Sequence, residues 1–377
     1  MFRDFIERPI KESVEKAKSQ NSIRLILTCL SLSMLLSSLG TSIANVALPT
    51  LSQTFNAAFQ EVQWIVLAYL LAITILTVTI GRLGDIIGRR RMLLSGIILF
   101  TLASVFCGVS TNLYFLIVIR FFQGIGGAAM MTLSLAFIGE IVQPNKTGSA
   151  MGLLGTMSAI GTALGPSLGG ILISLLGWQS VFLINVPIGV LNLILSYYYL
   201  PTDSQLNKNK VASFDKLGTF LLVLTLGSYT LALTIGRGNF RLINLILLGV
   251  VVAGLWLLIF VEKRNLSPLL NLAFFKDREL STGLGLSVLV ATVLMTTLVV
   301  GPFYLSRSFA FNPTLVGVIM SIGPLVVILS GFPIGHLVDK IGARRLTNFG
   351  LIGIMIGSLI LSIVPFEFGL FGYVDSI

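Results

Sequence analysis

Long apolar segments recur along the whole chain and are separated by short polar turns. A helix needs about 20 apolar residues to cross the hydrocarbon core of a bilayer. About eleven segments reach this length, near 24–49, 59–80, 92–110, 113–138, 149–175, 180–200, 217–236, 241–261, 280–305, 314–335 and 346–365. Because lipid offers no hydrogen-bond partner to a bare backbone, each segment must form a helix. The pattern predicts an all-α polytopic membrane protein.

The composition supports a lipid environment and excludes several other classes. Charged residues make up only 11% of the chain, against roughly 25% in soluble domains. The net charge of +10 arises in short loops, not on a basic face with interleaved aromatic residues, so we expect no nucleic-acid partner. His336 is the only histidine, and Cys29 and Cys107 lie in apolar segments. We therefore expect no metal, no cofactor and no enzymatic activity.

Basic residues fall mainly on one side of the predicted topology. With the N-terminus placed in the cytoplasm, all but four of the 25 Lys and Arg residues lie in inner segments; the exceptions are Arg120, Arg237, Arg241 and Arg307. This asymmetry is the one that the positive-inside rule describes. We expect an integral protein of the plasma (inner) membrane with a cytoplasmic N-terminus.

One charged turn between two apolar segments occurs twice. The first copy contains Gly81, Asp85, Gly88, Arg89 and Arg90, and the second contains Gly335, Asp339, Gly342 and Arg344. Two copies indicate two related halves, an organisation found in secondary transporters. We expect both turns to gate the inner side; the alternative is that they only fix orientation in the membrane.

The spacing of these copies suggests how the chain is divided. The longest polar break, 200–216, follows the sixth predicted span. If each copy follows the second helix of its half, the second half begins near residue 280. The predicted regions are a cytoplasmic tail or surface helix (1–22), a six-helix bundle (23–200), a loop with an inserted helix pair (201–279) and a partial second bundle of about three helices (280–377).

Arg120 is the costliest residue in the chain, because a charge at membrane depth costs about 2.5–3.5 kcal/mol on insertion scales. Such a group normally faces a bundle interior or a wet cavity. We assign Arg120, with Asn45, Gln123 and Gly124, to the translocation path. The alternative for Arg120 is that its side chain extends to the outer interface.

The fifth span carries glycines at every fourth position. Gly161, Gly165 and Gly169 share one helix face, followed by Gly170, and Pro166 removes a backbone hydrogen bond. Small residues let two helices approach closely. The pattern fits a bending or sliding interface and static tight packing equally well.

Taken together, these residues resemble the major facilitator superfamily, in particular its fourteen-helix drug:proton antiporter branch. The similarity runs along nearly the whole chain from about residue 25. Its motifs match at Gly81, Leu83, Asp85, Gly88, Arg89 and Arg90; at Arg120, Gln123, Gly124 and Gly126; at Gly161, Gly165, Pro166, Gly169 and Gly170; and at Asn45, Ala47, Leu48 and Pro49.

The resemblance implies a monomeric transporter that exports amphipathic or drug-like small molecules by alternating access, with protons as candidate partners in exchange. One alternative is a metabolite or lipid exporter of the same fold. Another is a transport-inactive membrane remnant or interaction subunit.

Two departures from the family pattern bear on these expectations. Gly40 stands where the family usually carries an aspartate, and Glu61 and Glu140 lie only at helix ends. Proton coupling is therefore expected to run through Glu140 or Glu61, or to be altered or absent. Fourteen helices would also need three further spans, so the chain is expected to be a truncated product or a fragment.

Overall fold

The computed structural model describes residues 2–203, 216–235, 242–264, 276–278, 280–293, 319 and 322–363. Within those residues every regular element is a helix, which confirms the all-α prediction. The elements are α1 (Phe2–Thr54), α2 (Phe59–Val62), α3 (Trp64–Ile87), α4 (Arg89–Gly108), α5 (Leu113–Ile141), the short 3₁₀ helix η1 (Pro144–Lys146), α6 (Thr147–Leu176), α7 (Ser180–Leu183), α8 (Asn185–Tyr199), α10 (Lys216–Thr234), α11 (Leu242–Arg264), α14 (Ile322–Ile341) and α15 (Ala343–Ile363).

Membrane-length helices dominate this part of the chain. Six of them are long and apolar enough to cross a bilayer, and the bent helix α6 makes a seventh. Two shorter apolar helices run over Leu217–Leu233 and Leu280–Val293. The predicted spans at 280–305 and 314–335 extend outside the described residues, so the full number of spans remains a prediction.

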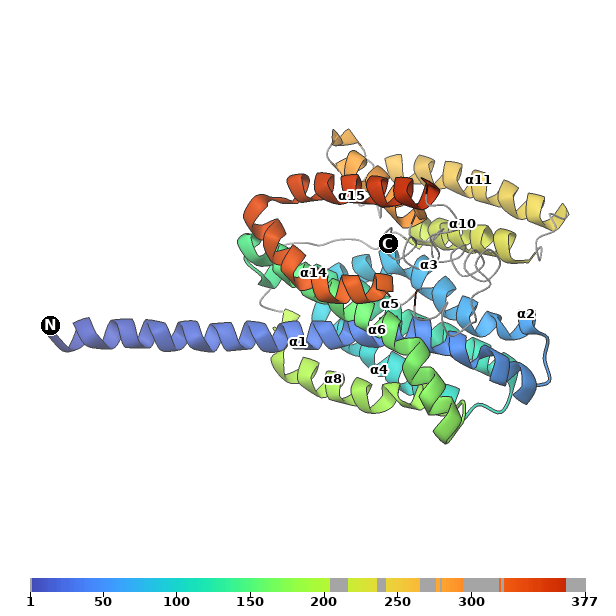
Figure 1. Cartoon of the computed structure of the whole chain (residues 1–377), viewed down its shortest axis with the longest axis horizontal. Coiled ribbons are helices and arrows are strands. Elements are labelled where there is room, and N and C mark those ends of the chain that lie inside the picture. The colour runs from blue at the N-terminus through green and yellow to red at the C-terminus, as the bar shows by residue number, and fades with distance from the viewer. Residues whose placement is uncertain are drawn as a thin grey trace.

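Helices α1 to α8 form one bundle around α5, which packs against α1, α3 and α4 (Figure 1). Helix α1 also packs along α6 and α8. Two clusters of buried side chains fill the bundle, one around Phe100 and Phe137 and the other around Ile43, Trp178 and Phe182. This arrangement fits the predicted first bundle.

Helix α1 begins at Phe2 and continues without a break to Thr54. Its first part projects well beyond the bundle (Figure 1). Residues 2–22 are therefore one helix with the first span, where the sequence suggested a separate surface helix or tail.

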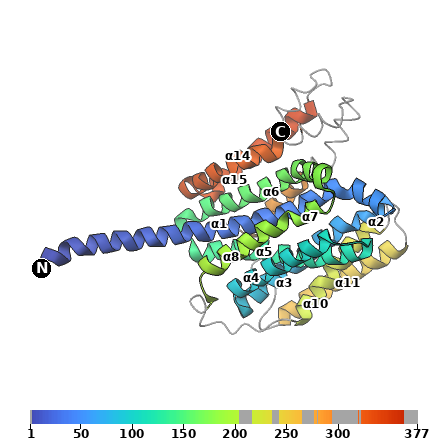
Figure 2. The same ribbon diagram turned by 90° about the horizontal axis from the view of Figure 1, so that it is seen from below.

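The remaining helices lie on two different sides of this bundle (Figure 2). Helices α10 and α11 pack against each other, and α10 contacts α3. Helix α14 packs along α6, and α15 follows α14. Helices α10 and α11 fall within the predicted insertion (201–279), and α14 and α15 fall within the predicted second bundle (280–377). The division into these four regions remains a prediction.

Candidate functional site

Both copies of the repeated turn adopt the same local structure. In the first, α3 ends, Gly88 takes a φ of +111°, and α4 begins at the next residue. In the second, Gly342 takes a φ of +91° between α14 and α15. A positive φ is easily reached only by glycine, which explains why this residue recurs at both places.

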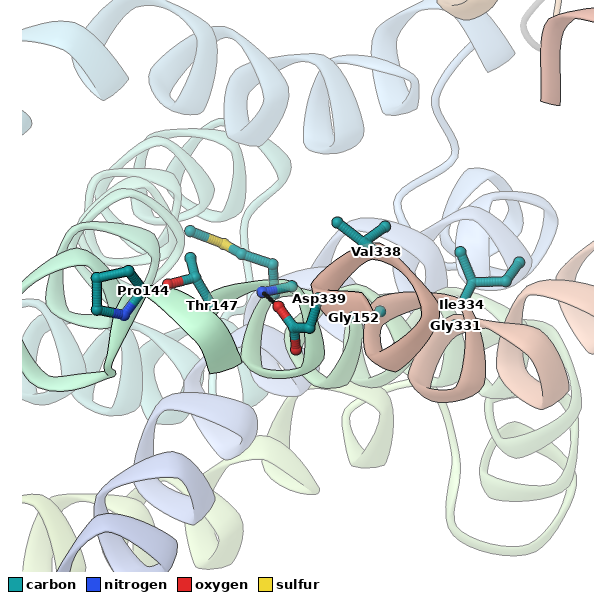
Figure 3. A pocket seen from close by; sticks show the side chains of 10 residues that line it. Pro144, Thr147, Gly152, Gly331, Ile334, Val338 and Asp339 are labelled. Atoms are coloured by element: carbon teal, nitrogen blue, oxygen red, sulfur yellow. Dashed lines mark hydrogen bonds between the residues drawn. The ribbon is translucent and has the colours of Figure 1, made fainter. Parts of the chain in front are cut away.

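Asp339 of the second copy binds the start of α6, in the first half of the chain. Its carboxylate accepts hydrogen bonds from the N–H groups of Gly148 at 2.7 Å and Ser149 at 2.8 Å, and from the Ser149 hydroxyl. Figure 3 shows Asp339 of α14 beside the start of α6. A helix N-terminus carries partial positive charge, which favours an anion there. Burial acts to raise the pKa of the Asp339 carboxyl, but the hydrogen bonds from Ser149 and Gly148 outweigh it and hold that pKa below its usual value.

Asp85 of the first copy makes a different contact. It pairs with Arg89, whose Nη2 lies 2.8 Å from Asp85 Oδ1. Arg89 Nη1 lies 2.9 Å from Glu140 Oε1 and also donates to the Ala136 carbonyl, so Arg89 joins the end of α3 to the end of α5. In the described part of the chain, Asp85 has no partner in the second half.

Asp203 makes a further contact at the start of α4, and it is not among the residues predicted from the sequence. Its carboxylate accepts hydrogen bonds from the backbone N–H groups of Arg90 at 2.8 Å and Arg91 at 3.3 Å, at the start of α4. The Arg90 guanidinium in turn lies 5.5 Å from the centre of the Tyr197 ring on α8. The only sequence signal was an acidic residue just after an apolar helix. Arg344, at the corresponding place in the second copy, is exposed.

The contact between α6 and α14 is made by glycines. A Cβ atom on Gly152 would lie 2.5 Å from the Gly331 carbonyl oxygen, and one on Gly335 would collide with the Gly148 carbonyl oxygen. The two backbones therefore touch directly, as small residues allow in membrane helices. A cavity of about 530 Å³ opens beside this contact (Figure 3).

The predicted glycine face of α6 packs against α1. A Cβ atom on Gly161 would lie 2.6 Å from the Leu35 carbonyl oxygen, and one on Gly165 would collide with the Ser42 hydroxyl. Ser42 also donates to the Gly161 carbonyl at 3.0 Å. At Gly169 the nearest atom would be 3.2 Å away. Close packing is thus present along this face.

Helix α6 also bends at the predicted place. The segments before and after residue 166 form an angle of 43°, where Pro166 removes a backbone hydrogen bond. Gly170 is exposed and has no neighbour near its Cβ position. The helix therefore combines tight packing with a bend, and movement about that bend remains a prediction.

Arg120 is fully buried inside the first bundle. Its Nε donates to the Ile65 carbonyl at 3.0 Å, and its Nη2 donates to the Gly40 carbonyl at 3.0 Å. Its third bond, from Nη1 to Gln123 Oε1, is 2.6 Å long, and the guanidinium lies 4.3 Å from the centre of the Tyr69 ring. Arg120 therefore ties α1, α3 and α5 together and does not extend to the outer interface.

The four residues assigned to the translocation path do not gather in one place. Gln123 is buried beside Arg120 and donates to the Ser104 hydroxyl at 2.7 Å. Gly124 packs against the backbone of Tyr69. Asn45, in contrast, is exposed and donates only to Thr41 of its own helix. Arg120, Gln123 and Gly124 thus lie inside the bundle, and their role in the path remains a prediction.

The position where the family pattern has an aspartate is filled by other side chains. A Cβ atom on Gly40 would lie 3.1 Å from the Tyr69 hydroxyl and 3.2 Å from the Phe100 ring. Glu140 pairs with Arg89, and Glu61 accepts the Ala58 N–H at 3.0 Å in the short helix α2. In the described residues, no group of three or more His, Cys, Asp or Glu side chains is placed to hold a metal ion.

Membrane-length helices and a charged turn that recurs at two helix ends define the described part of the chain as a polytopic membrane protein. Residues 30–374 match the family model of the Major Facilitator Superfamily. The chain belongs to this superfamily, whose members are transporters and not enzymes.

Named relatives and solved structures agree with this placement. The chain is 33% identical to the riboflavin transporter RibZ of Clostridioides difficile (strain 630), over 87% of this chain and 70% of that protein. It is 31% identical to the multidrug resistance protein Stp of Mycobacterium tuberculosis (strain CDC 1551 / Oshkosh), over 90% and 63%. The chain thus spans 63 to 70% of the length of these two relatives.

Two solved structures share the fold at low sequence identity. The proton:xylose symporter XylE matches with a TM-score of 0.63 and 17% identity, over 95% of this chain and 79% of that chain. The human organic anion transporter MFSD10 matches with a TM-score of 0.61 and 16% identity, over 94% and 83%.

Proposed function

We propose that this chain exports amphipathic or drug-like small molecules by alternating access between its two halves. The observation that carries the proposal is the contact between α6 and α14. There, Asp339 of α14 accepts hydrogen bonds from N–H groups at the start of α6. A contact made of glycine backbones and a few part-buried hydrogen bonds can separate without unpacking a core. It is therefore suited to open and close the inner side.

The first half is suited to move as one body in this cycle. Arg120 ties α1, α3 and α5 together, while Gln123 links α5 to α4 through Ser104. Breaking such a buried hydrogen-bonded charge is costly, so these helices stay together. Helix α6, bent near residue 166 and packed through glycines, is the element free to adjust.

The proposed class of substrate is based on the names of the related proteins. Stp is named a multidrug resistance protein and RibZ a riboflavin transporter. Drug-like amphipathic compounds are the first candidate, and a metabolite of similar character is the second. If protons are exchanged, Glu140 is the better placed of the two acidic candidates, because it pairs with Arg89 beside the first turn.

Export can be tested in cells that lack endogenous efflux pumps. We expect cells making the protein to accumulate less of a fluorescent amphipathic dye than cells without it, and riboflavin measured in parallel tests the second candidate. Asp339→Asn should weaken export, whereas Asp277→Asn, which removes a carboxylate far from α6 in sequence, should not. If cells with and without the protein accumulate the dye equally and also accumulate riboflavin equally, although the protein is shown to be in the membrane, the result would count against the proposal.

Proton coupling needs a separate measurement in proteoliposomes. If coupling runs through the two glutamates, substrate movement should dissipate a pH gradient in the unmodified protein, and Glu140→Gln with Glu61→Gln should abolish that dissipation. Dissipation that persists unchanged in the double variant would refute this route.

A further inference from the structure

A second cavity of about 450 Å³ lies beside the α6–α14 contact and shares Asp339 with the first. Its walls come from three helices that are distant in sequence. Ile23 and Leu27 belong to α1, Ser149 and Leu153 to α6, and Phe332 to α14. Any molecule held there would touch both halves of the chain.

One end of this cavity carries a net positive charge, because two lysines and one aspartate line it. Lys146 and Lys340 both line it, and neither makes an ion pair with another described residue. Asp339 is the only acidic residue among the described residues that line the cavity, and its oxygens already accept hydrogen bonds from Gly148 and Ser149. The electrostatics therefore favour an anion between the two lysines.

The other end of the cavity is apolar. Leu27 and Leu153 form part of this wall, and Phe332 is 52% exposed beside them. Ile23, which also lines the cavity, stands in the sequence between the charged residues of 1–22 and the apolar segment near 24–49. The cavity thus lies where a span begins, at the boundary between hydrocarbon and headgroups. A soluble anion would gain nothing from the apolar wall, whereas a lipid chain would.

We propose that this cavity binds an anionic phospholipid, with the phosphate between Lys146 and Lys340 and an acyl chain against Leu27 and Phe332. Basic pockets between membrane helices bind such headgroups for the same electrostatic reason. A lipid bound there contacts α6 and α14 together and stabilises their contact. That regulatory consequence rests on the proposed function, but the binding itself does not.

Native mass spectrometry of the purified protein tests the binding, with phosphatidylglycerol as the probe and phosphatidylcholine as the neutral comparison. A lysine near a lipid surface contributes about a fivefold gain in affinity. The double variant Lys146→Gln, Lys340→Gln should therefore bind phosphatidylglycerol on the order of 30-fold more weakly. The matched control Lys263→Gln, Lys276→Gln removes the same charge elsewhere and should bind as the unmodified protein does.

Two further measurements distinguish binding of a lipid from binding of a free anion. Phe332→Ser should weaken phosphatidylglycerol binding, and millimolar inorganic phosphate should not displace the lipid. Displacement by phosphate would show a site for free anions instead. Equal binding by the lysine variant and its control, or phosphatidylcholine bound as tightly as phosphatidylglycerol, would overturn the proposal.

A measurement on the unmodified protein avoids any folding defect of the variants. Phosphatidylglycerol carrying a photoreactive acyl chain should label peptides that contain Leu27, Leu153 or Phe332. Labelling confined to other peptides would contradict the proposal. None of these readouts involves transport, so a negative result here leaves the export proposal untouched.

Discussion

At the scale of single residues, Arg120 shows how a charge is accommodated inside a membrane bundle. The partners that it uses are two backbone carbonyls, one amide oxygen and the face of an aromatic ring. This arrangement depends on the planar, forked guanidinium, which a lysine ammonium cannot imitate.

Arg120→Lys should therefore destabilise the protein, by about 2–4 kcal/mol, since losing one partner of a buried charge network costs this much or more. Thermal unfolding of the detergent-purified variant measures the effect. Arg91→Lys is the matched control, because the Arg91 side chain is 78% exposed and should change stability by less than about 0.5 kcal/mol. Equal unfolding temperatures for the two variants would show that the Arg120 geometry is not needed.

Gly40 supports a second prediction at this scale. A methyl group there would press on the Tyr69 hydroxyl and the Phe100 ring, so Gly40→Ala should cost about 1–3 kcal/mol. Gly139→Ala is the control, because nothing lies within 4 Å of its Cβ position and alanine is the better helix former. A Gly40→Ala protein as stable as Gly139→Ala would mean that Tyr69 and Phe100 adjust freely.

At the scale of the elements, sequence reasoning worked best where a pattern has one local cause. Glycine at 88 and 342 could be linked to a helix stop, and the bend near Pro166 to a missing hydrogen bond. Contacts between residues that are distant in the sequence could not be predicted from such local patterns. Asp85 and Asp339 look equivalent, yet one pairs within its own turn and the other reaches α6.

The α6–α14 contact gives an element-scale prediction. A side chain at residue 335 would meet the backbone of α6, which cannot move aside cheaply, so Gly335→Leu should push α14 away. Spin labels at the exposed positions Asn145, in η1 just before α6, and Arg344, in α15 just after α14, should then lie farther apart. Gly353→Leu, with nothing within 4 Å of its Cβ position, should leave that distance unchanged. An unchanged distance in Gly335→Leu would show that α14 does not pack there.

The contact between α6 and α14 should also depend on pH. Because the folded pKa of Asp339 is lowered, its stabilising effect is fully present above the ordinary carboxyl pKa of about 3.9. The effect is lost as the pH falls through the lower folded pKa. The spin-label distance should thus be constant near neutral pH and lengthen only below about pH 4. In Asp339→Asn the spin-label distance should not lengthen in this way as the pH falls. If it does, another titratable group causes the change.

At the scale of the whole molecule, the apolar segments predicted a membrane fold, and the family comparison confirms it. The two related halves suggested by the repeated turn remain a prediction. Asp203 and the two cavities could not be foreseen, because they arise where segments far apart in the chain meet. The hydrophobic pattern fixes which segments are helices, but it carries little information on which helices touch.

Orientation in the membrane is the last whole-molecule prediction, and it rests on the distribution of basic residues. Ile86→Cys and Ile341→Cys, at side chains 37% and 40% exposed near the two turns, should react with a membrane-impermeant maleimide only after cells are permeabilised. Gln60→Cys, between α1 and α3, should react in intact cells. The native Cys29 and Cys107 are buried and should add little background. Labelling of residues 86 and 341 in intact cells would place the turns outside, and the Asp339 contact would then close the outer side of the protein.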